Sequence, residues 1–270
     1  MQNVALKAEH SIMDLSNKPG KFERFWSNFF NFFYGPFIKV NNIENYEDFA
    51  PAIFVFNHST TFETVLIYNF LLKNPKIKRR VSFIIDWMYA HIPFIGKFIR
   101  VIDPILVYNK KAKIKKLNQK KIAEYNIYEE SVRRLKLGKS VGMYPEGTRN
   151  RDPENLKRGR KGIGKIALES GISVIPIGVD FPKRIKKNKI PKLGRIILNI
   201  GKKIDFSNEV DIANNVKNDL SLSETEKSKI IKHLEAKITY EVMQSLSGLC
   251  GKKYPYNLPA VPEIAKRYLP

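Results

Sequence analysis

Cysteine is nearly absent from this chain, and several features that define whole classes of protein are missing as well. The single cysteine, Cys250, excludes an intramolecular disulfide framework and a cysteine-rich metal site. No run of about 18 or more uncharged apolar residues occurs, so we expect no membrane-spanning helix. The first ten residues lack the long apolar core of a secretory signal peptide, and we expect no signal peptide.

Histidine is also rare, and the spacing of the histidines is not that of metal ligands. The four are His10, His58, His91 and His233. We therefore expect no metal site, and nothing in the sequence indicates a bound cofactor. The Gly-x-Ser-x-Gly turn that exposes the nucleophile of many serine esterases is absent too, which disfavours a serine esterase.

Acidic residues are scarce relative to basic ones. The 270 residues include 48 Lys and Arg against 26 Asp and Glu, which gives a net charge of +22. Such an excess predicts an anionic partner: a nucleic acid, a membrane surface or a phosphorylated substrate. The hydrophobic fraction of 43% is nevertheless that of a folded domain, and the length suffices for one large α/β domain with a sizeable core.

Short apolar runs alternate with longer, more polar segments through the middle of the chain. The expected strands are 51–57, 80–85, 104–108, 140–144, 173–179 and 194–200, and the expected helices are 59–73, 112–137 and 159–170. Strands that alternate with helices predict an α/β fold with a mostly parallel sheet flanked by helices.

Aromatic residues concentrate just before this region, in residues 22–38. At helical spacing they form one face, and Gly35-Pro36 ends the predicted helix. An aromatic face with basic flanks predicts an amphipathic helix at a membrane interface, although a helix packed on the protein's own core remains an alternative. The face consists of Phe22, Phe25, Trp26, Phe29, Phe30 and Phe33.

The pattern divides the chain into three expected parts. Residues 1–49 are an N-terminal leader with the amphipathic aromatic helix, and residues 50–205 are the α/β domain. Residues 206–270 form a helical C-terminal extension that ends in a proline-containing tail. Ser223 and Glu226 have the spacing of a capping box, which predicts the start of a long helix.

Two polar motifs follow two of the predicted strands directly. In Asn57-His58-Ser59-Thr60-Thr61-Phe62-Glu63, a carboxylate stands five residues after a histidine. Ligands bind at the carboxyl ends of strands in open α/β sheets. Glu63 in the first turns of a helix could hold one imidazole nitrogen of His58 and make the other a base.

The second motif, Tyr144-Pro145-Glu146-Gly147-Thr148-Arg149, predicts an anion clamp. Gly147 allows a tight turn whose backbone N–H groups bind an anion, and Thr148 and Arg149 can bind phosphate oxygens. A carboxylate beside a phosphate repels it, so we expect Glu146 to accept from a substrate hydroxyl or to position Arg149.

Together the two motifs resemble those of the glycerolipid acyltransferase family, which includes the 1-acylglycerol-3-phosphate acyltransferases. That family carries Asn-His-x4-Asp and, downstream, Phe-Pro-Glu-Gly-Thr-Arg, and the resemblance covers roughly residues 50–205. Residues 93–96 with 105–108, residues 157–162 and residues 174–177 resemble further blocks of the family. The resemblance implies that Pro176, in the last of these, shapes the acceptor pocket.

The chain departs from the family pattern at two places. Glu63 replaces the usual aspartate, but some acyltransferases of the broader superfamily, notably those that acylate lipid A, also carry glutamate. The arginine that usually ends the second block is absent, and Asn109, Lys110 or Lys111 stands near that place. We expect Lys110 to bind the acceptor phosphate there through a single ammonium charge, rather than through the two parallel hydrogen bonds that an arginine donates.

The resemblance implies an O-acyltransferase with His58 and Glu63 as the catalytic pair. Its acceptor would be a lysophospholipid, most simply 1-acylglycerol-3-phosphate, and its donor acyl-CoA or acyl carrier protein. With the basic surface and the aromatic helix, it predicts a peripheral protein on an anionic membrane surface, on the cytoplasmic face.

Other functions remain open at this point. The acceptor could be another lipid, or the chain could be a non-catalytic basic lipid-binding protein of the same fold. A hydrolase could use the same base on water. A nucleic-acid-binding module rests on charge alone and lacks a recognisable motif, so we expect no nucleic acid partner.

Overall fold

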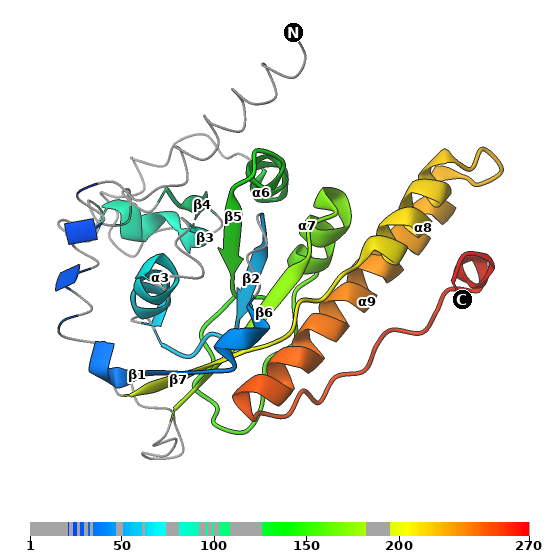
Figure 1. Cartoon of the computed structure of the whole chain (residues 1–270). Coiled ribbons are helices and arrows are strands. Elements are labelled where there is room, and N and C mark those ends of the chain that lie inside the picture. The colour runs from blue at the N-terminus through cyan, green and yellow to red at the C-terminus, as the bar shows by residue number, and fades with distance from the viewer. Residues whose placement is uncertain are drawn as a thin grey trace, which may run out of the picture. The chain divides into compact units, whose positions relative to one another are not determined.

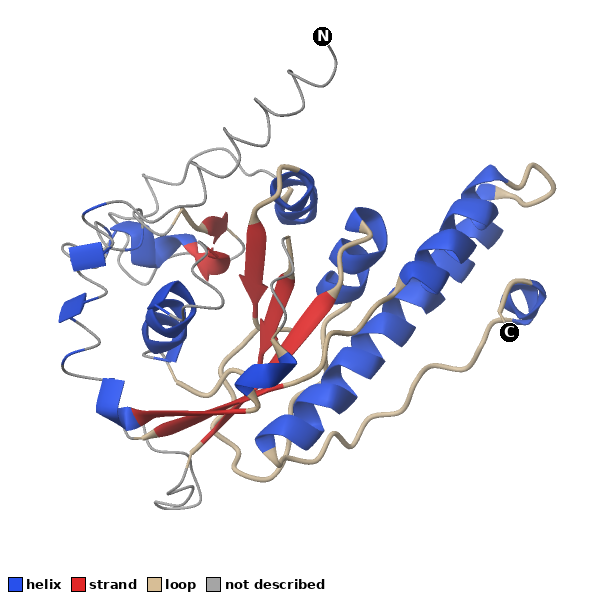
Figure 2. Cartoon of the chain, viewed as in Figure 1, coloured by secondary structure: helices blue, strands red, loops and turns tan. Residues whose placement is uncertain are grey.

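The computed structural model describes residues 21, 24–25, 28–29, 32, 35–46, 51–60, 63–73, 81–91, 96, 99, 103–108, 126–181 and 195–269 (Figures 1 and 2). The chain folds as two compact units. Unit 1 comprises Met1–Pro36, Glu47–Pro51 and Thr64–Gly142, and unit 2 comprises Phe37–Tyr46, Ala52–Glu63 and Met143–Pro270.

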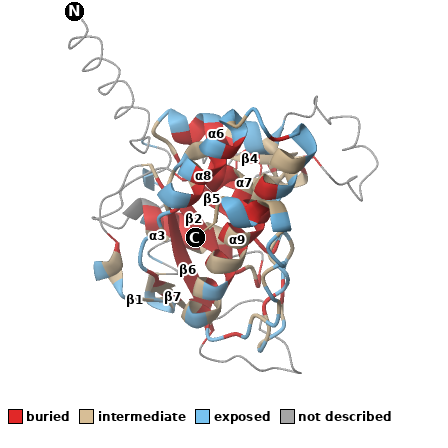
Figure 3. Cartoon of the chain, turned by 90° about the vertical axis from the view of Figure 1, so that its right-hand side faces the viewer, coloured by how far each residue is buried: buried red, intermediate tan, exposed pale blue. Residues whose placement is uncertain are grey.

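Unit 2 contains four strands, in the spatial order β1 (Ile38–Asn41), β7 (Ile196–Ile200), β6 (Val174–Asp180) and β2 (Ile53–Phe56). The β1–β7 and β2–β6 pairs are parallel, and the β6–β7 pair is antiparallel. Every residue of β2 is buried, as are six of the seven in β6, which explains why both read as continuous apolar runs (Figure 3).

Three helices complete unit 2: α7 (Gly162–Ser170), α8 (Ser207–Asn218) and α9 (Glu224–Cys250). The long helix α9 packs against β6, α7 and α8. A Cβ atom on Gly178 of β6 would lie 2.4 Å from the backbone of Leu249, so glycine is what allows the end of α9 to approach the sheet this closely.

The predicted capping box at the start of α9 is present, with Ser223 and Glu226 each accepting from the other's backbone N–H. The helix ends at Cys250, and the tail returns alongside α9 to a short 3-10 helix, Glu263–Arg267, that contacts it (Figure 1). The Tyr268 hydroxyl donates to Asp219 there.

Unit 1 contains the parallel strands β3 (Val81–Asp86), β4 (Ile105–Val107) and the first three residues of β5 (Ser140–Met143), with β3 in the middle. Most of α3 (Glu63–Lys73) and all of α6 (Ile127–Lys136) belong to it. The buried Arg134 of α6 fixes the entrance to β4, because its guanidinium donates to the Asp103 carbonyl (2.5 Å), to Ser82 Oγ (2.8 Å) and to Glu130 Oε1 (2.8 Å).

The structure confirms the α/β class with a mostly parallel sheet and helices around it, and it adds two corrections. The strand β1 lies in a segment that the sequence assigns to the leader, because four residues of mixed burial carry almost no pattern. The predicted helix 112–137 is wrong at Asn126, whose extended backbone and side chain cap α6 by accepting from the Tyr128 N–H. Residues 109–125, the rest of that prediction, lie outside the described residues.

The aromatic helix is described only in part. Lys21, Arg24, Phe25, Asn28, Phe29 and Phe32 are helical and exposed. The remainder of 22–34 lies outside the described residues, so the amphipathic helix stays a prediction. Within the part of the chain that the structure describes, no helix combines the length and the apolar character that crossing a bilayer requires.

Candidate active site

The end of β2 is fixed by the side chain of Asn57, which takes the place of a further strand residue. Its Nδ2 donates to the Val179 carbonyl (2.8 Å), and its Oδ1 accepts from the Val179 N–H (2.6 Å). This reciprocal pair imitates a backbone ladder with β6. The strand therefore stops at a defined point, and His58 follows at its carboxyl end.

His58 lies against Glu63, as its sequence spacing predicts. The distance from Nδ1 to Glu63 Oε1 is 2.5 Å. The Glu63 carboxylate is fully buried, whereas the imidazole side chain is 18% exposed. When Glu63 is ionised, Nδ1 carries the proton that it donates, and Nε2 is the nitrogen left to act on a substrate.

Glu63 is held by a capping box at the start of α3. Its Oε2 accepts from the Thr60 N–H (3.0 Å), while its own N–H donates to Thr60 Oγ1 (3.3 Å). Its Oε1 also accepts from the Ser59 N–H (2.7 Å). The extra methylene of glutamate thus allows one carboxylate to cap the helix and orient the imidazole.

Two opposing effects act on the Glu63 carboxyl group. Burial raises the pKa of Glu63, and the hydrogen bonds from His58, Thr60 and Ser59 oppose that shift. These donors favour the ionised form of the buried carboxyl group, whereas burial, the larger effect, favours the protonated form.

The second motif folds into the tight turn that its glycine predicts. The Gly147 N–H donates to the Tyr144 carbonyl (2.9 Å), with Pro145 and Glu146 between them, and Gly147 has a φ of 67°. The Gly147 amide, which the sequence assigns to a bound anion, is instead used within the turn.

Two contacts join the two motifs, and a third joins His58 to the residue that follows the second motif. The rings of Tyr144 and His58 stack with centroids 4.1 Å apart. The His58 N–H donates to Glu146 Oε1 (3.0 Å), and the His58 carbonyl accepts from the Asn150 N–H (2.6 Å). His58 therefore has its backbone and one ring face held by residues 144–150.

Glu146 is buried, and its partners belong to the chain rather than to a substrate. Besides the His58 N–H, it accepts from Asn150 Nδ2 (2.8 Å) and from the Lys157 N–H (2.9 Å), both through Oε2. The contact with a substrate hydroxyl or with Arg149 stays a prediction. In the structure this carboxylate ties together three segments of unit 2.

A cationic rim follows the turn. Lys157 Nζ donates to Thr148 Oγ1 (3.2 Å) and to the Arg149 carbonyl (2.8 Å), and both Arg149 and Lys157 are exposed. Arg160 lies against the turn as well, since a Cβ atom on Gly147 would be 2.4 Å from its Nε. Lys157 and Arg160 have no assigned role in the sequence prediction, although they belong to the basic, glycine-containing block 157–162.

The remaining predicted residues lie elsewhere. Pro176 is buried inside β6, paired with Val55, and its ring lies against Gly201. Lys110 is outside the described residues. Cys250, which is not among the predicted site residues, is buried at the end of α9. Burial raises the pKa of its thiol to about 11, and a thiol that stays protonated is a poor nucleophile for carrying an acyl group covalently.

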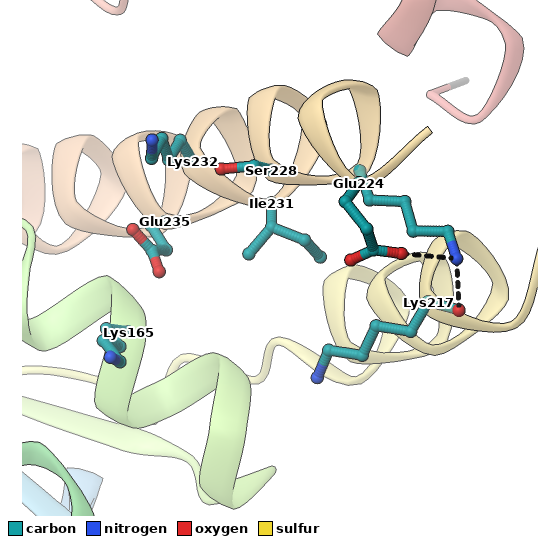
Figure 4. A pocket seen from close by; sticks show the side chains of 8 residues that line it. Lys165, Lys217, Glu224, Ser228, Ile231, Lys232 and Glu235 are labelled. Carbon is teal, nitrogen blue, oxygen red and sulfur yellow. Dashed lines mark hydrogen bonds and ion pairs between the residues drawn. The ribbon is translucent and has the colours of Figure 1, made fainter. Parts of the chain in front are cut away.

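Away from His58, a hollow of about 560 Å³ lies between α7, α8 and α9 (Figure 4). Lys227 bridges its wall, with Nζ 3.2 Å from both Glu224 Oε1 and the Lys217 carbonyl. No histidine lines it, and among the described residues no group of acidic, histidine or cysteine side chains is placed to hold a metal ion. The chemistry-bearing groups are those around His58. The hollow is lined by Lys165, Lys217, Glu224, Lys227, Ser228, Ile231, Lys232 and Glu235.

The site thus consists of a histidine held by a buried carboxylate beside a cationic turn, and comparison with known proteins gives the family. The Acyltransferase family model matches residues 37–180, more than half of the chain, and the chain belongs to this family.

Two proteins of known identity are similar to it. The chain is 29% identical over 146 residues to the chloroplastic 1-acyl-sn-glycerol-3-phosphate acyltransferase LPAT1 of Arabidopsis thaliana, a stretch that covers 53% of this chain and 36% of that protein. The crystal structure of the 1-acyl-sn-glycerophosphate acyltransferase PlsC from Thermotoga maritima aligns with 21% identity and a TM-score of 0.45, over 77% of this chain and 71% of that one.

Proposed function

We propose that the protein transfers a fatty acyl group from a thioester donor to the hydroxyl of a lysophospholipid, with 1-acylglycerol-3-phosphate as the acceptor. The observation that carries the proposal is the 2.5 Å contact between His58 Nδ1 and the buried Glu63 carboxylate. Membership of the acyltransferase family and the similarity to a 1-acylglycerol-3-phosphate acyltransferase support it.

The geometry supports direct transfer without an acyl-enzyme. His58 Nε2 takes the proton of the acceptor hydroxyl while the oxygen attacks the thioester carbonyl. The tetrahedral intermediate then collapses, the carbon–sulfur bond breaks, and the proton passes from the imidazolium to the leaving sulfur. Glu63 stabilises the imidazolium between these steps, as the aspartate does in a serine hydrolase triad. The donor is a thioester of coenzyme A or of acyl carrier protein.

The rim formed by Thr148, Arg149 and Lys157 is suited to the acceptor phosphate. The exposed guanidinium can bind phosphate oxygens through two parallel hydrogen bonds, and the ammonium of Lys157 adds a charge beside it. Because the turn is tied to the backbone of His58, a phosphate on this rim would place the acceptor close to the base.

Substitution of Arg149 tests the assignment of the phosphate. We expect R149M to lower kcat/KM for 1-acylglycerol-3-phosphate about 100-fold, the loss typical of a charge-assisted hydrogen bond, and to leave a monoacylglycerol acceptor almost unaffected. Steady-state assays with labelled acyl-CoA measure both. R267M, at an exposed arginine of the C-terminal 3-10 helix, is the control. An equal loss with both acceptors would place Arg149 outside phosphate recognition.

We also propose that the protein docks on an anionic membrane surface, which brings it to its lipid acceptor. The helical residues Phe25, Phe29 and Phe32 are 63%, 45% and 78% exposed, and Lys21 and Arg24 stand beside them. Exposed phenylalanines next to basic side chains suit the headgroup region of a bilayer.

Binding to vesicles tests this docking. Replacing Phe25, Phe29 and Phe32 together with serine should weaken binding to vesicles that contain phosphatidylglycerol by at least about tenfold in a sedimentation assay. The reason is that three rings that the proposal buries in the bilayer are lost. L220S, at a leucine that is 96% exposed on unit 2, is a matched control that should not change binding. Unchanged binding of the triple variant, or equal binding of the wild type to neutral vesicles in high salt, would contradict the proposal.

A further inference from the structure

Lys252 is a buried lysine that the proposed mechanism does not use. It follows α9, after Gly251, whose φ of 60° turns the chain away from the helix. The residue is 5% exposed, and its Nζ has no hydrogen-bond partner among the described residues. A buried amine without a partner is costly, so its presence calls for a compensating interaction.

The tail that carries Lys252 is fastened to the segment that follows the anion turn. Its neighbour Lys253 forms a parallel bridge with Asn155, in which the Lys253 N–H donates to the Glu154 carbonyl (2.7 Å) and the Leu156 N–H donates to the Lys253 carbonyl (2.8 Å). The same segment gives its Lys157 N–H to Glu146. Backbone hydrogen bonds therefore join the tail to the segment that holds Glu146, which in turn holds the backbone of His58.

Two buried carboxylates share this region of unit 2 with Lys252. Glu63 is 0% exposed and Glu146 is 2% exposed. The groups that favour the charged form of Lys252 are the carboxylates of Glu146, Glu63 and Asp152 and, where it is ionised, the Cys250 thiol. Burial lowers the pKa of the Lys252 ammonium, and these four groups oppose that shift. With both carboxylates ionised and the imidazole neutral, one buried positive charge is needed to limit the excess of negative charge.

We propose that Lys252 is a positioning residue for the proposed acyl transfer, in which its buried ammonium is the counter-charge of Glu146 and Glu63 and keeps Glu63 ionised beside His58. It comes from the C-terminal extension, outside the residues 37–180 that match the family model. This assignment rests on the proposed role of His58. The extension is then part of the catalytic apparatus.

The sign of the expected effect follows from the charges. Removal of a positive charge makes protonation of the Glu63 carboxylate easier, so the pKa of Glu63, which burial already raises, rises further. Loss of activity on the acidic side then occurs at a higher pH. A unit charge about 10 Å away at an effective dielectric constant of about 20 corresponds to a shift of about one pH unit.

The experiment compares K252M, which keeps the length of the side chain, with K253M, at the exposed neighbouring lysine. We expect the acidic limb of kcat/KM to move up by about one pH unit in K252M and to stay in place in K253M and in K252R. A ¹³C NMR titration of the Glu63 carboxyl group, assigned with E63Q, gives the same shift without turnover. This second readout separates failure of the inference from failure of the proposed function.

Each outcome decides the matter. An unshifted Glu63 titration in folded K252M overturns the proposal, even if activity falls, because a purely structural lysine would alter stability but not the ionisation of the carboxylate. An equal shift in K253M overturns it too, since a general effect of surface charge would then suffice. If K252M does not fold, the same pH profile and NMR titration are measured on K252Q, which is also uncharged.

Discussion

The variant H58A should lose acyl transfer almost completely, with kcat lower by about 10³- to 10⁴-fold, because general-base catalysis contributes on that order. The fold should survive, since the backbone N–H and carbonyl of His58 keep their bonds to Glu146 and Asn150. Radiolabelled acyl-CoA with 1-acylglycerol-3-phosphate as acceptor measures the loss.

A matched substitution excludes a general effect of histidine removal. His91 Nδ1 donates to the Trp87 carbonyl in unit 1 (3.1 Å), and H91A should keep most of the activity. Binding of the acceptor by H58A, measured by calorimetry, should remain within a few-fold of the wild type. An H58A protein that transfers acyl groups at a near-normal rate would remove the basis of the proposed mechanism.

The second large effect is expected at Glu63. Glutamine has one acceptor oxygen, whereas the carboxylate uses both oxygens, toward His58 and Ser59 on one side and toward Thr60 on the other. E63Q should therefore lower kcat by about 100- to 1,000-fold, through loss of imidazolium stabilisation. It should also lower the free energy of unfolding by about 2 kcal/mol, since a buried donor loses its acceptor. Urea unfolding and steady-state kinetics measure the two effects.

The protein contains its own control for this substitution. Glu226 occupies the same place in the capping box of α9 but is far more exposed and holds no histidine. E226Q should lose only the stability of a helix cap, about 0.5–1 kcal/mol, and keep its activity. If E63Q were as active as E226Q, Glu63 would be a helix cap alone.

The contact between His58 and Glu63 could be predicted because its geometry is local. The apolar run 53–56 shows where a buried strand ends, and five residues separate the base from its carboxylate. The turn at Gly147 could be predicted for the same reason, since proline and glycine at these positions specify it. In each case the information lies within a few residues of the chain.

The interactions that assemble the site could not be predicted in this way. The pairing of Asn57 with Val179 spans 122 residues, and the contact of His58 with Glu146 spans 88. The sequence indicates that Glu146 is polar, but only the fold shows that its oxygens are occupied by the chain. The start of α6 was missed for a related reason, because the basic residues before Asn126 continue a helical pattern that the cap interrupts.

The position of Glu146 has a consequence for how the enzyme could diversify. Its carboxylate joins the backbone of His58 to that of Lys157, whereas the Lys157 ammonium meets the Thr148 hydroxyl and the Arg149 carbonyl at the rim. In the proposed mechanism, headgroup selectivity and proton abstraction therefore depend on separate atoms of one scaffold. Substitutions on the rim could redirect the enzyme to a different polar lipid while the reaction itself is conserved, which makes those three side chains the natural starting point for redesigning acceptor choice.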